Sequence, residues 1–73
     1  MKEQGILNPP YQKISKRLYS IREAAVYLGR SEWAVREMIW AGKLPYITDG
    51  RRKLLDIRDM DEWIEQQRKR FTF

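Results

Sequence analysis

The 73 residues of this sequence include no cysteine and no histidine. Disulfide bonds are therefore excluded, and a zinc site loses the two ligand types that it most often uses. The usual catalytic nucleophile and general base are absent as well, so we expect no enzymatic activity, no cofactor and no small-molecule substrate. No apolar run approaches the roughly 20 residues of a membrane span. We expect a soluble chain in a reducing cytoplasm, with no membrane contact.

Acidic residues are fewer than basic ones, with 10 Asp and Glu against 15 Lys and Arg, which gives a net charge of +5. The imbalance is concentrated in the first 53 residues, which hold 11 bases and 5 acids. A positive field of this kind favours a polyanionic partner such as nucleic acid. The length is sufficient for one domain only.

The two ends of the chain differ from its middle. Residues 1–16 contain Gly5 and the Pro9–Pro10 pair and show no sustained periodicity, which predicts a flexible N-terminal arm. Residues 17–70 carry the periodic patterns of a folded domain. Residues 71–73, with Phe71 and Phe73, are expected to form a C-terminal tail that folds back or contacts another chain.

Two short helices are predicted near the middle. Ser20 and Glu23 fit a capping box, and Gly29 is suited to a helix C-terminus, which predicts a helix over about residues 21–28. Ser31 and Gly42 bracket a second helix over about residues 32–41. The short connection between them predicts a helix-turn-helix. The apolar positions expected to face inward are Ile21, Ala24, Ala25, Leu28, Ala34, Val35, Met38 and Ile39.

A hairpin and a third helix complete the pattern. Asp49–Gly50 is a hairpin signal between apolar residues, so we expect a hairpin over about residues 45–55, with its register left open. Leu18 and Tyr19 are candidates for a short strand. Asp56 is the expected cap of a helix over about residues 57–69, with acids at its start and bases at its end. Its inward positions are Met60, Trp63, Ile64 and Gln67.

This order of elements predicts a small, mainly α-helical winged helix-turn-helix. The sequence also resembles the small excisionase-type DNA-binding domains, which are related to the MerR-type winged helix. Four pieces carry the resemblance over about residues 18–64: S-I-R-E-A-A-x-x-L-G, S-x-x-x-V-x-x-x-I-x-x-G-K-L-P, the G-R-R turn and D-E-W-I. Trp33 and Trp40 depart from the family pattern, which has small, polar or basic residues there.

The resemblance implies a function as well as a fold. In that family the second helix enters the major groove of double-stranded DNA, and the hairpin wing touches the adjacent minor groove or its phosphates. Members act as recombination directionality factors of phages and mobile elements, or as small transcriptional regulators. The resemblance therefore implies a nucleoid-associated protein, with a recombinase or integrase and further copies of itself as candidate partners. It leaves the choice between excision factor and regulator open.

The outer face of the second helix carries the residues that we expect to read bases. Arg36 is suited to a bidentate contact with guanine, although an ion pair with Glu32 is the alternative. Trp33 is expected to touch a thymine methyl or sugar edges, whereas Trp40 is expected to pack against the arm or the wing. The complete set predicted for this helix, including phosphate contacts at its start, is Arg30, Ser31, Glu32, Trp33, Arg36, Glu37 and Trp40.

The hairpin tip combines cations with a glycine that permits close approach to a DNA backbone. The alternative is a charged hairpin that protects an exposed sheet edge from aggregation. The residues predicted for this contact are Lys43, Thr48, Gly50, Arg51, Arg52 and Lys53. A protein-interaction module is the competing function, because Trp33, Trp40, Phe71 and Phe73 could form an aromatic binding surface.

Overall fold

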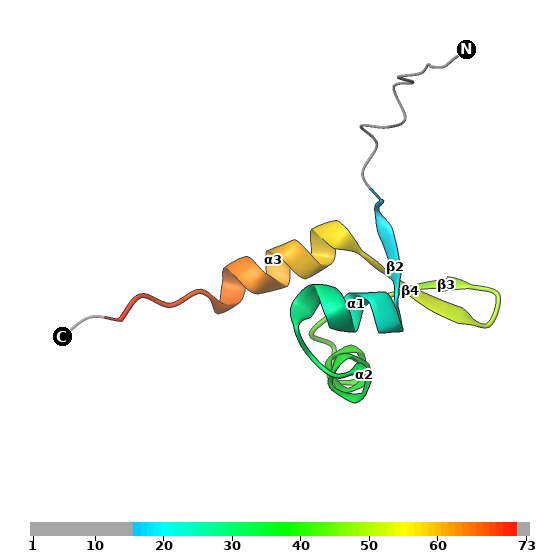
Figure 1. The fold of residues 1–73 in the computed structure, drawn as a ribbon, viewed down its shortest axis with the longest axis horizontal. Coiled ribbons are helices and arrows are strands. Elements are labelled where there is room, and N and C mark those ends of the chain that lie inside the picture. Colours follow the sequence, from blue (N-terminus) through cyan, green and yellow to red (C-terminus); the bar gives the residue numbers. More distant parts are fainter. Residues whose placement is uncertain (1–15, 72–73) are drawn as a thin grey trace, which may run out of the picture.

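A computed structural model describes residues 16–71 of the chain. It contains the helices α1 (Ile21–Leu28), α2 (Glu32–Trp40) and α3 (Ile57–Gln67), and the strands β2 (Leu18–Ser20), β3 (Ile47–Asp49) and β4 (Arg52–Asp56). Three helices and a three-stranded antiparallel sheet form a winged helix-turn-helix, which confirms the predicted fold (Figure 1). The predicted arm, except for Lys16, and the last two residues of the predicted tail lie outside the described residues.

Helix α1 has the predicted boundaries, and its capping box is formed. The backbone N–H of Glu23 donates to Ser20 Oγ over 3.1 Å, and the backbone N–H of Ser20 donates to Glu23 Oε1 over 2.9 Å. Gly29 ends the helix at a φ of 68°, in the left-handed region where glycine is the least strained residue. The chain can therefore reverse into α2 within three residues.

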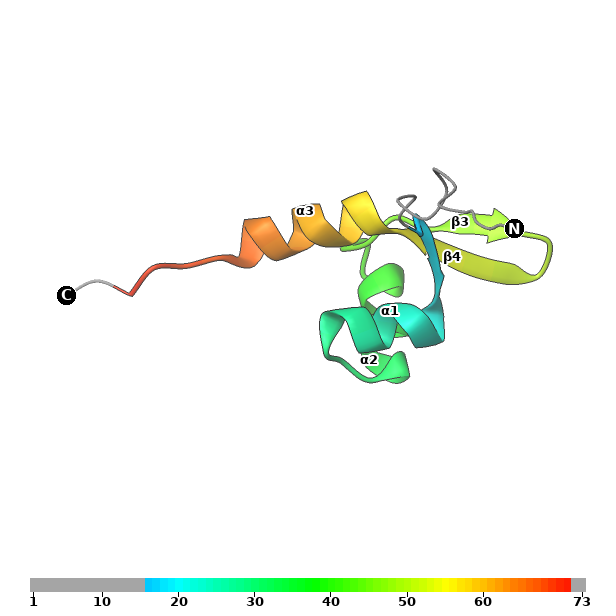
Figure 2. The same ribbon diagram turned by 45° about the horizontal axis from the view of Figure 1, so that its top comes forward.

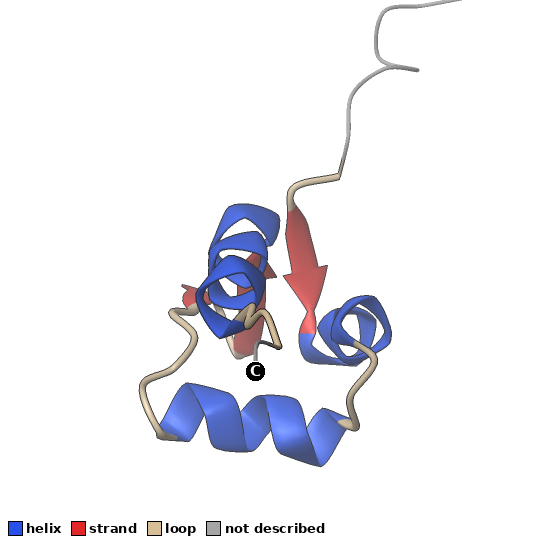
Figure 3. Cartoon of the chain, turned by 90° about the vertical axis from the view of Figure 1, so that its left-hand side faces the viewer, coloured by secondary structure: helices blue, strands red, loops and turns tan. Residues whose placement is uncertain are grey.

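Helix α2 begins as predicted and ends one residue early. The backbone N–H of Ala34 donates to Ser31 Oγ over 3.0 Å, so Ser31 is the N-cap. Ala41, predicted as the last helical residue, is instead the C-cap, and Gly42 follows with a φ of 76°. Figure 3 shows α2 as the lowest helix, which crosses beneath the other two and leaves its outer side uncovered by the described elements.

The sheet has the order β2-β4-β3, so β4 is its central strand. Leu18 and Tyr19 do form a strand, and this strand pairs with the inner half of β4. The hairpin turn consists of Gly50 and Arg51, one residue later than the Asp49–Gly50 signal suggests, because Asp49 pairs with Arg52. The pairs are Leu18 with Asp56, Tyr19 with Leu55, Ser20 with Leu54, Ile47 with Leu54, Thr48 with Lys53 and Asp49 with Arg52.

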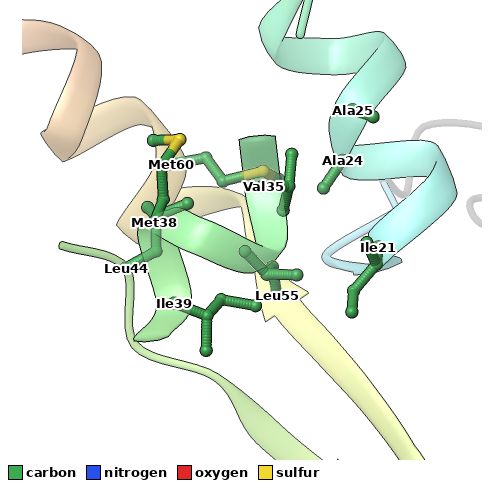
Figure 4. Close-up of a cluster of buried hydrophobic side chains, with 9 residues drawn as sticks. All are labelled: Ile21, Ala24, Ala25, Val35, Met38, Ile39, Leu44, Leu55 and Met60. Carbon is green, nitrogen blue, oxygen red and sulfur yellow. The ribbon is translucent and has the colours of Figure 1, made fainter. Parts of the chain in front are cut away.

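The core lies where α1, α2 and α3 meet β4. Val35, Leu55 and Met60 are completely buried and come from three different elements. Leu44, in the connection between α2 and β3, is only 2% exposed and was not among the expected inward positions. The buried cluster comprises Ile21, Ala24, Ala25, Val35, Met38, Ile39, Leu44, Leu55 and Met60 (Figure 4).

Helix α3 ends at Gln67, two residues earlier than predicted. Arg68 is the C-cap and has an extended backbone, with φ −64° and ψ 134°. Gln67 is exposed, contrary to the prediction that it faces inward, whereas Met60 is buried and Trp63 is partly buried. Beyond Ile64 every described residue of the helix is exposed, and short helices depend on packing for their stability. The terminal bases therefore follow the last turn rather than lying within it.

The wing and α3 leave the central strand β4 in opposite directions, as Figures 1 and 2 both show. One end of β4 forms the hairpin with β3, and the other end continues directly into α3.

Within residues 16–71, none of the helices has the length and apolar character needed to cross a bilayer.

Candidate nucleic-acid interface

The two sides of α2 have different roles. Val35, Met38 and Ile39 are buried against the rest of the domain. The other side presents Trp33 and Arg36, together with Glu32, Glu37 and Trp40, all of which are exposed. Because the inner positions hold the helix against the core, the outer side chains have a fixed orientation relative to the wing.

The wing tip and the outer side of α2 border one open cleft, in which Arg36 lies together with the three basic residues of the wing. The first residues of α1 complete it. Five of the eight lining residues are Arg or Lys and one is acidic. The full lining is Ser20, Ile21, Arg22, Glu32, Arg36, Arg51, Arg52 and Lys53. The cleft, hereafter the basic cleft, is thus a concave surface with a strong excess of positive charge.

Arg36 is available for an external partner. The alternative of an ion pair with Glu32 is not formed, and Glu32 Oε2 instead lies 3.9 Å from Nε of Arg22 on α1. Among residues 16–71, no carboxylate lies within 4.0 Å of the Arg36 guanidinium. The Arg22–Glu32 pair is solvent-exposed, so it orients both side chains while contributing little to stability.

Trp33 and Trp40 contact each other on the outer side of α2. Their ring centroids are 5.2 Å apart and the ring planes are inclined at 80°, an edge-to-face arrangement. The prediction that Trp40 packs against the wing is wrong, since Trp40 is 63% exposed and its described aromatic neighbour is Trp33, which is 60% exposed. The arm, its other predicted neighbour, lies outside the described residues.

The wing turn has the geometry expected of a close-approach element. Gly50 has a φ of 63° at the first turn position, as the primed hairpin turns require. Beyond its chain neighbours, no atom lies within 4 Å of where a Cβ of residue 50 would be. Glycine is therefore favoured here by the positive φ and not by a lack of space for a side chain. Lys53 Nζ lies 5.8 Å from the ring centroid of Tyr46, and Thr48 is exposed opposite Lys53 on β3.

Eight of the predicted contact residues do not line the basic cleft, namely Arg30, Ser31, Trp33, Glu37, Trp40, Lys43, Thr48 and Gly50, and two of these, Arg30 and Lys43, are basic. Arg30 is exposed in the turn between α1 and α2, where its backbone N–H donates to Ala25 O over 2.9 Å. Lys43 lines a separate groove beside α3, together with Trp63 and Gln66. The chain turns toward α3 directly after α2, so Lys43 is separated from the basic residues of the wing with which the sequence grouped it.

Arg22, the basic residue of α1, lines the basic cleft although the sequence did not single it out. Arg22 follows Ser20, which pairs with Leu54 of the hairpin, so the β2–β4 pairing places the start of α1 next to the wing. The sequence signal is the proximity of Arg22 to the capping box. Using that signal requires knowing that residues 18–20 pair with the hairpin, which local patterns do not reveal.

An ion pair fixes the base of the wing. Nε and Nη2 of Arg17 lie 2.9 Å from Oδ2 of Asp56, whose side chain is 11% exposed. Oδ1 of Asp56 accepts from the backbone N–H of Arg58 over 2.9 Å and caps α3. The backbone N–H of Ile57 also donates to Arg17 O over 2.8 Å. One carboxylate therefore joins the chain before β2 to the junction between β4 and α3.

Two further polar contacts tie α1 to its surroundings. Hydrogen bonds from Lys16 and from the Ser20 backbone lower the pKa of Glu23 from 4.5 to about 2. The Tyr27 hydroxyl donates to Asp61 of α3, and this bond raises the pKa of Tyr27. The side chains of Lys16, Glu23, Tyr27 and Asp61 do not line the basic cleft, so these contacts leave its cations free of them.

Comparison with known proteins gives one match. The family model of the helix-turn-helix domain matches residues 18–68, which include every helix and strand that the structure describes. No curated protein and no solved structure shows a significant match to the chain. The match covers more than half of the chain and coincides with the observed helix-turn-helix. The chain belongs to the helix-turn-helix domain family, a class of DNA-binding domain.

Proposed function

We propose that this protein binds double-stranded DNA sequence-specifically, with α2 in the major groove and the wing on the adjacent backbone or minor groove. The observation that supports this most directly is the basic cleft, in which Arg36 of α2 and the basic side chains of the wing lie together. Recognition requires base contacts for specificity and phosphate contacts for register. The basic cleft holds a candidate base contact, Arg36, and candidate phosphate contacts, the basic side chains of the wing, in one surface.

Arg36 is the proposed base-reading residue. It projects from the second helix of the helix-turn-helix, the element that enters the major groove in this class of domain. A guanidinium without a carboxylate partner can form the bidentate contact with O6 and N7 of guanine. Glu32 and Glu37 flank Arg36 on the same helix and repel phosphates that would otherwise bind it out of register.

Arg51, Arg52 and Lys53 are the proposed backbone contacts of the wing, with Arg22 joining them from α1. At about 0.9 counterions released per phosphate contact, these four cations give a slope of log K against log salt of about −3.6. Thr48, Arg30 and the start of α2 at Ser31 are proposed additional phosphate contacts, because each is exposed. Lys43, beside α3, is the member of the predicted set with the weakest structural support.

The test is a comparison of specific and random DNA. We expect Arg36→Ala to weaken binding to a selected site by about 1–3 kcal/mol while leaving binding to random duplex nearly unchanged. Arg51→Ala should weaken both equally and reduce the salt slope by about 0.9. Lys69→Ala, which removes an exposed charge outside the basic cleft, is the matched control. Equal losses for Arg36→Ala on both duplexes, measured by fluorescence anisotropy, would overturn its base-reading role.

For the biological role we propose a recombination directionality factor, with a small transcriptional regulator as the alternative. The support is the resemblance of the first two helices, the turn and the last helix to excisionase-type domains. An excision factor bends its attachment site and acts beside an integrase, so circular-permutation gel shifts and a recombination assay, with any integrase encoded next to this protein, test the role. Binding to a single promoter, without bending or an effect on excision, would favour the regulator.

A further inference from the structure

Trp33 and Trp40, hereafter the tryptophan pair, form an apolar surface that the core of the domain does not use. Each indole is about three-fifths exposed, at 60% and 63%, and neither belongs to the buried cluster. Their edge-to-face contact fixes the two rings relative to each other, which reduces the ordering cost of binding through them. The pair is therefore a preformed surface on the helix that we propose enters the major groove.

The rings of the pair lean toward each other over the middle of α2. Seven residues of helix rise by about 10 Å, yet the ring centroids are only 5.2 Å apart. The intervening turn is the one from which Arg36 and Glu37 emerge. The apolar surface thus adjoins the guanidinium that we assign to a guanine.

The surroundings of the pair favour DNA as its occupant. Arg36 and the basic residues of the wing line the basic cleft, and Arg36 lies between Trp33 and Trp40 along α2, so the charge that attracts a duplex lies next to the apolar surface. Among the groups that the four bases present in the major groove, the methyl group belongs to thymine alone. We propose that the tryptophan pair reads thymine methyl groups within one or two base pairs of the base contacted by Arg36. This inference rests on the proposed function.

Replacing thymine by uracil tests the proposal, because it removes the methyl group and keeps base pairing and every hydrogen-bonding group. A site is first obtained by selection from random duplexes with the full chain, and each thymine is then replaced singly. We expect one or two positions, within two base pairs of a guanine, at which the loss of the methyl group weakens binding about fourfold, the factor that corresponds to ~0.8 kcal/mol. Uracil tolerated at every position would overturn the proposal.

Variants of the protein show whether the pair is responsible. Trp33→Ala and Trp40→Ala should bind the thymine and uracil duplexes with equal affinity at those positions, because the methyl group has lost its contact. Val26→Ala, which shortens an 81% exposed apolar residue on α1, should keep the fourfold difference. Circular dichroism and thermal unfolding verify that the tryptophan variants are folded, as expected for exposed side chains.

The outcomes separate this proposal from the function on which it rests. A chain that binds no duplex, or that binds selected and random duplexes with equal affinity, refutes the proposed function. A chain that discriminates by Arg36 but ignores uracil, or whose tryptophan variants keep the thymine preference, refutes only the reading of methyl groups. Unchanged DNA affinity in the double variant Trp33→Ala/Trp40→Ala would refute it as well and would assign the pair to a protein partner.

Discussion

Asp56 is the residue whose substitution tests most directly how the fold holds the wing in place. Its carboxylate combines two roles, since Oδ2 binds the guanidinium of Arg17 and Oδ1 caps α3 by accepting from the N–H of Arg58. Asp56→Asn removes the charge but keeps an oxygen that can cap the helix, because Asn is as good an N-cap as Asp. Asp56→Ala removes both interactions. The two variants therefore separate the ion pair from the cap.

The expected magnitudes follow from the exposure of the partners. The Arg17 side chain is 57% exposed and returns to water once its partner is neutral, which keeps the loss below the 3–5 kcal/mol of a fully buried pair. We expect Asp56→Asn to lower the free energy of unfolding by about 1–2 kcal/mol, the range for hydrogen bonds to charged groups less a contribution from screening. Asp56→Ala should lose about 1 kcal/mol more, the typical value of an N-cap.

Urea unfolding at neutral pH gives the free energies, and thermal unfolding gives an independent check, since 1 kcal/mol shifts the Tm of so small a domain by about 4–8 °C. In a double-mutant cycle, Arg17→Ala combined with Asp56→Asn should show a coupling of about 1 kcal/mol. Strictly additive losses would refute the reasoning, as would an Asp56→Asn variant as stable as the wild type. Either result would mean that the pair does not hold β2 against β4.

The remaining predictions concern the core, the wing and the first helix. Met60→Ala should lower the free energy of unfolding by about 2–5 kcal/mol in urea titrations, because Met60 is completely buried. Gly50→Ala should cost about 1 kcal/mol in the same assay, because its φ of 63° strains an L-residue while the space beside it is open; a neutral effect would indicate a different turn. The lowered pKa of Glu23 means that its stabilisation is present above pH 4.5 and lost as the pH falls toward 2. Wild type and Glu23→Gln should therefore differ in Tm at pH 7 and converge near pH 2.

Local signals in the sequence were sufficient for the helix starts. Ser20, Ser31 and Asp56 each accept a hydrogen bond from a backbone N–H one turn into the next helix or closer, and such a contact depends only on neighbouring residues. The end of α3 was not predictable in the same way. Its pattern of bases continues past Gln67, but the helix stops where its packing surface stops, which is a tertiary property.

Local signals in the sequence also identified some, but not all, of the residues that line the basic cleft. Arg36 and the cations of the wing could be identified from residue type and spacing, and the structure brings them together. Arg22 joins them only through the pairing of β2 with β4, which links residues more than 30 positions apart. The expectation that Trp40 packs against the wing rests on its place near the end of α2, whereas its helical position, opposite the buried Met38, puts it on the exposed side.

The central strand β4 contributes both to the stability of the domain and to the placement of the wing. Its inner residues Leu54 and Leu55 are buried in or beside the core, while its outer end carries Arg52 and Lys53 into the basic cleft. A strand cannot slip by one residue without moving its buried side chains to the opposite face. Side chains two residues apart on a strand share a face, so the burial of Leu55 fixes the face of β4 on which Lys53 lies. In a domain of this size, the same few contacts that keep the chain folded also align its candidate DNA-binding residues.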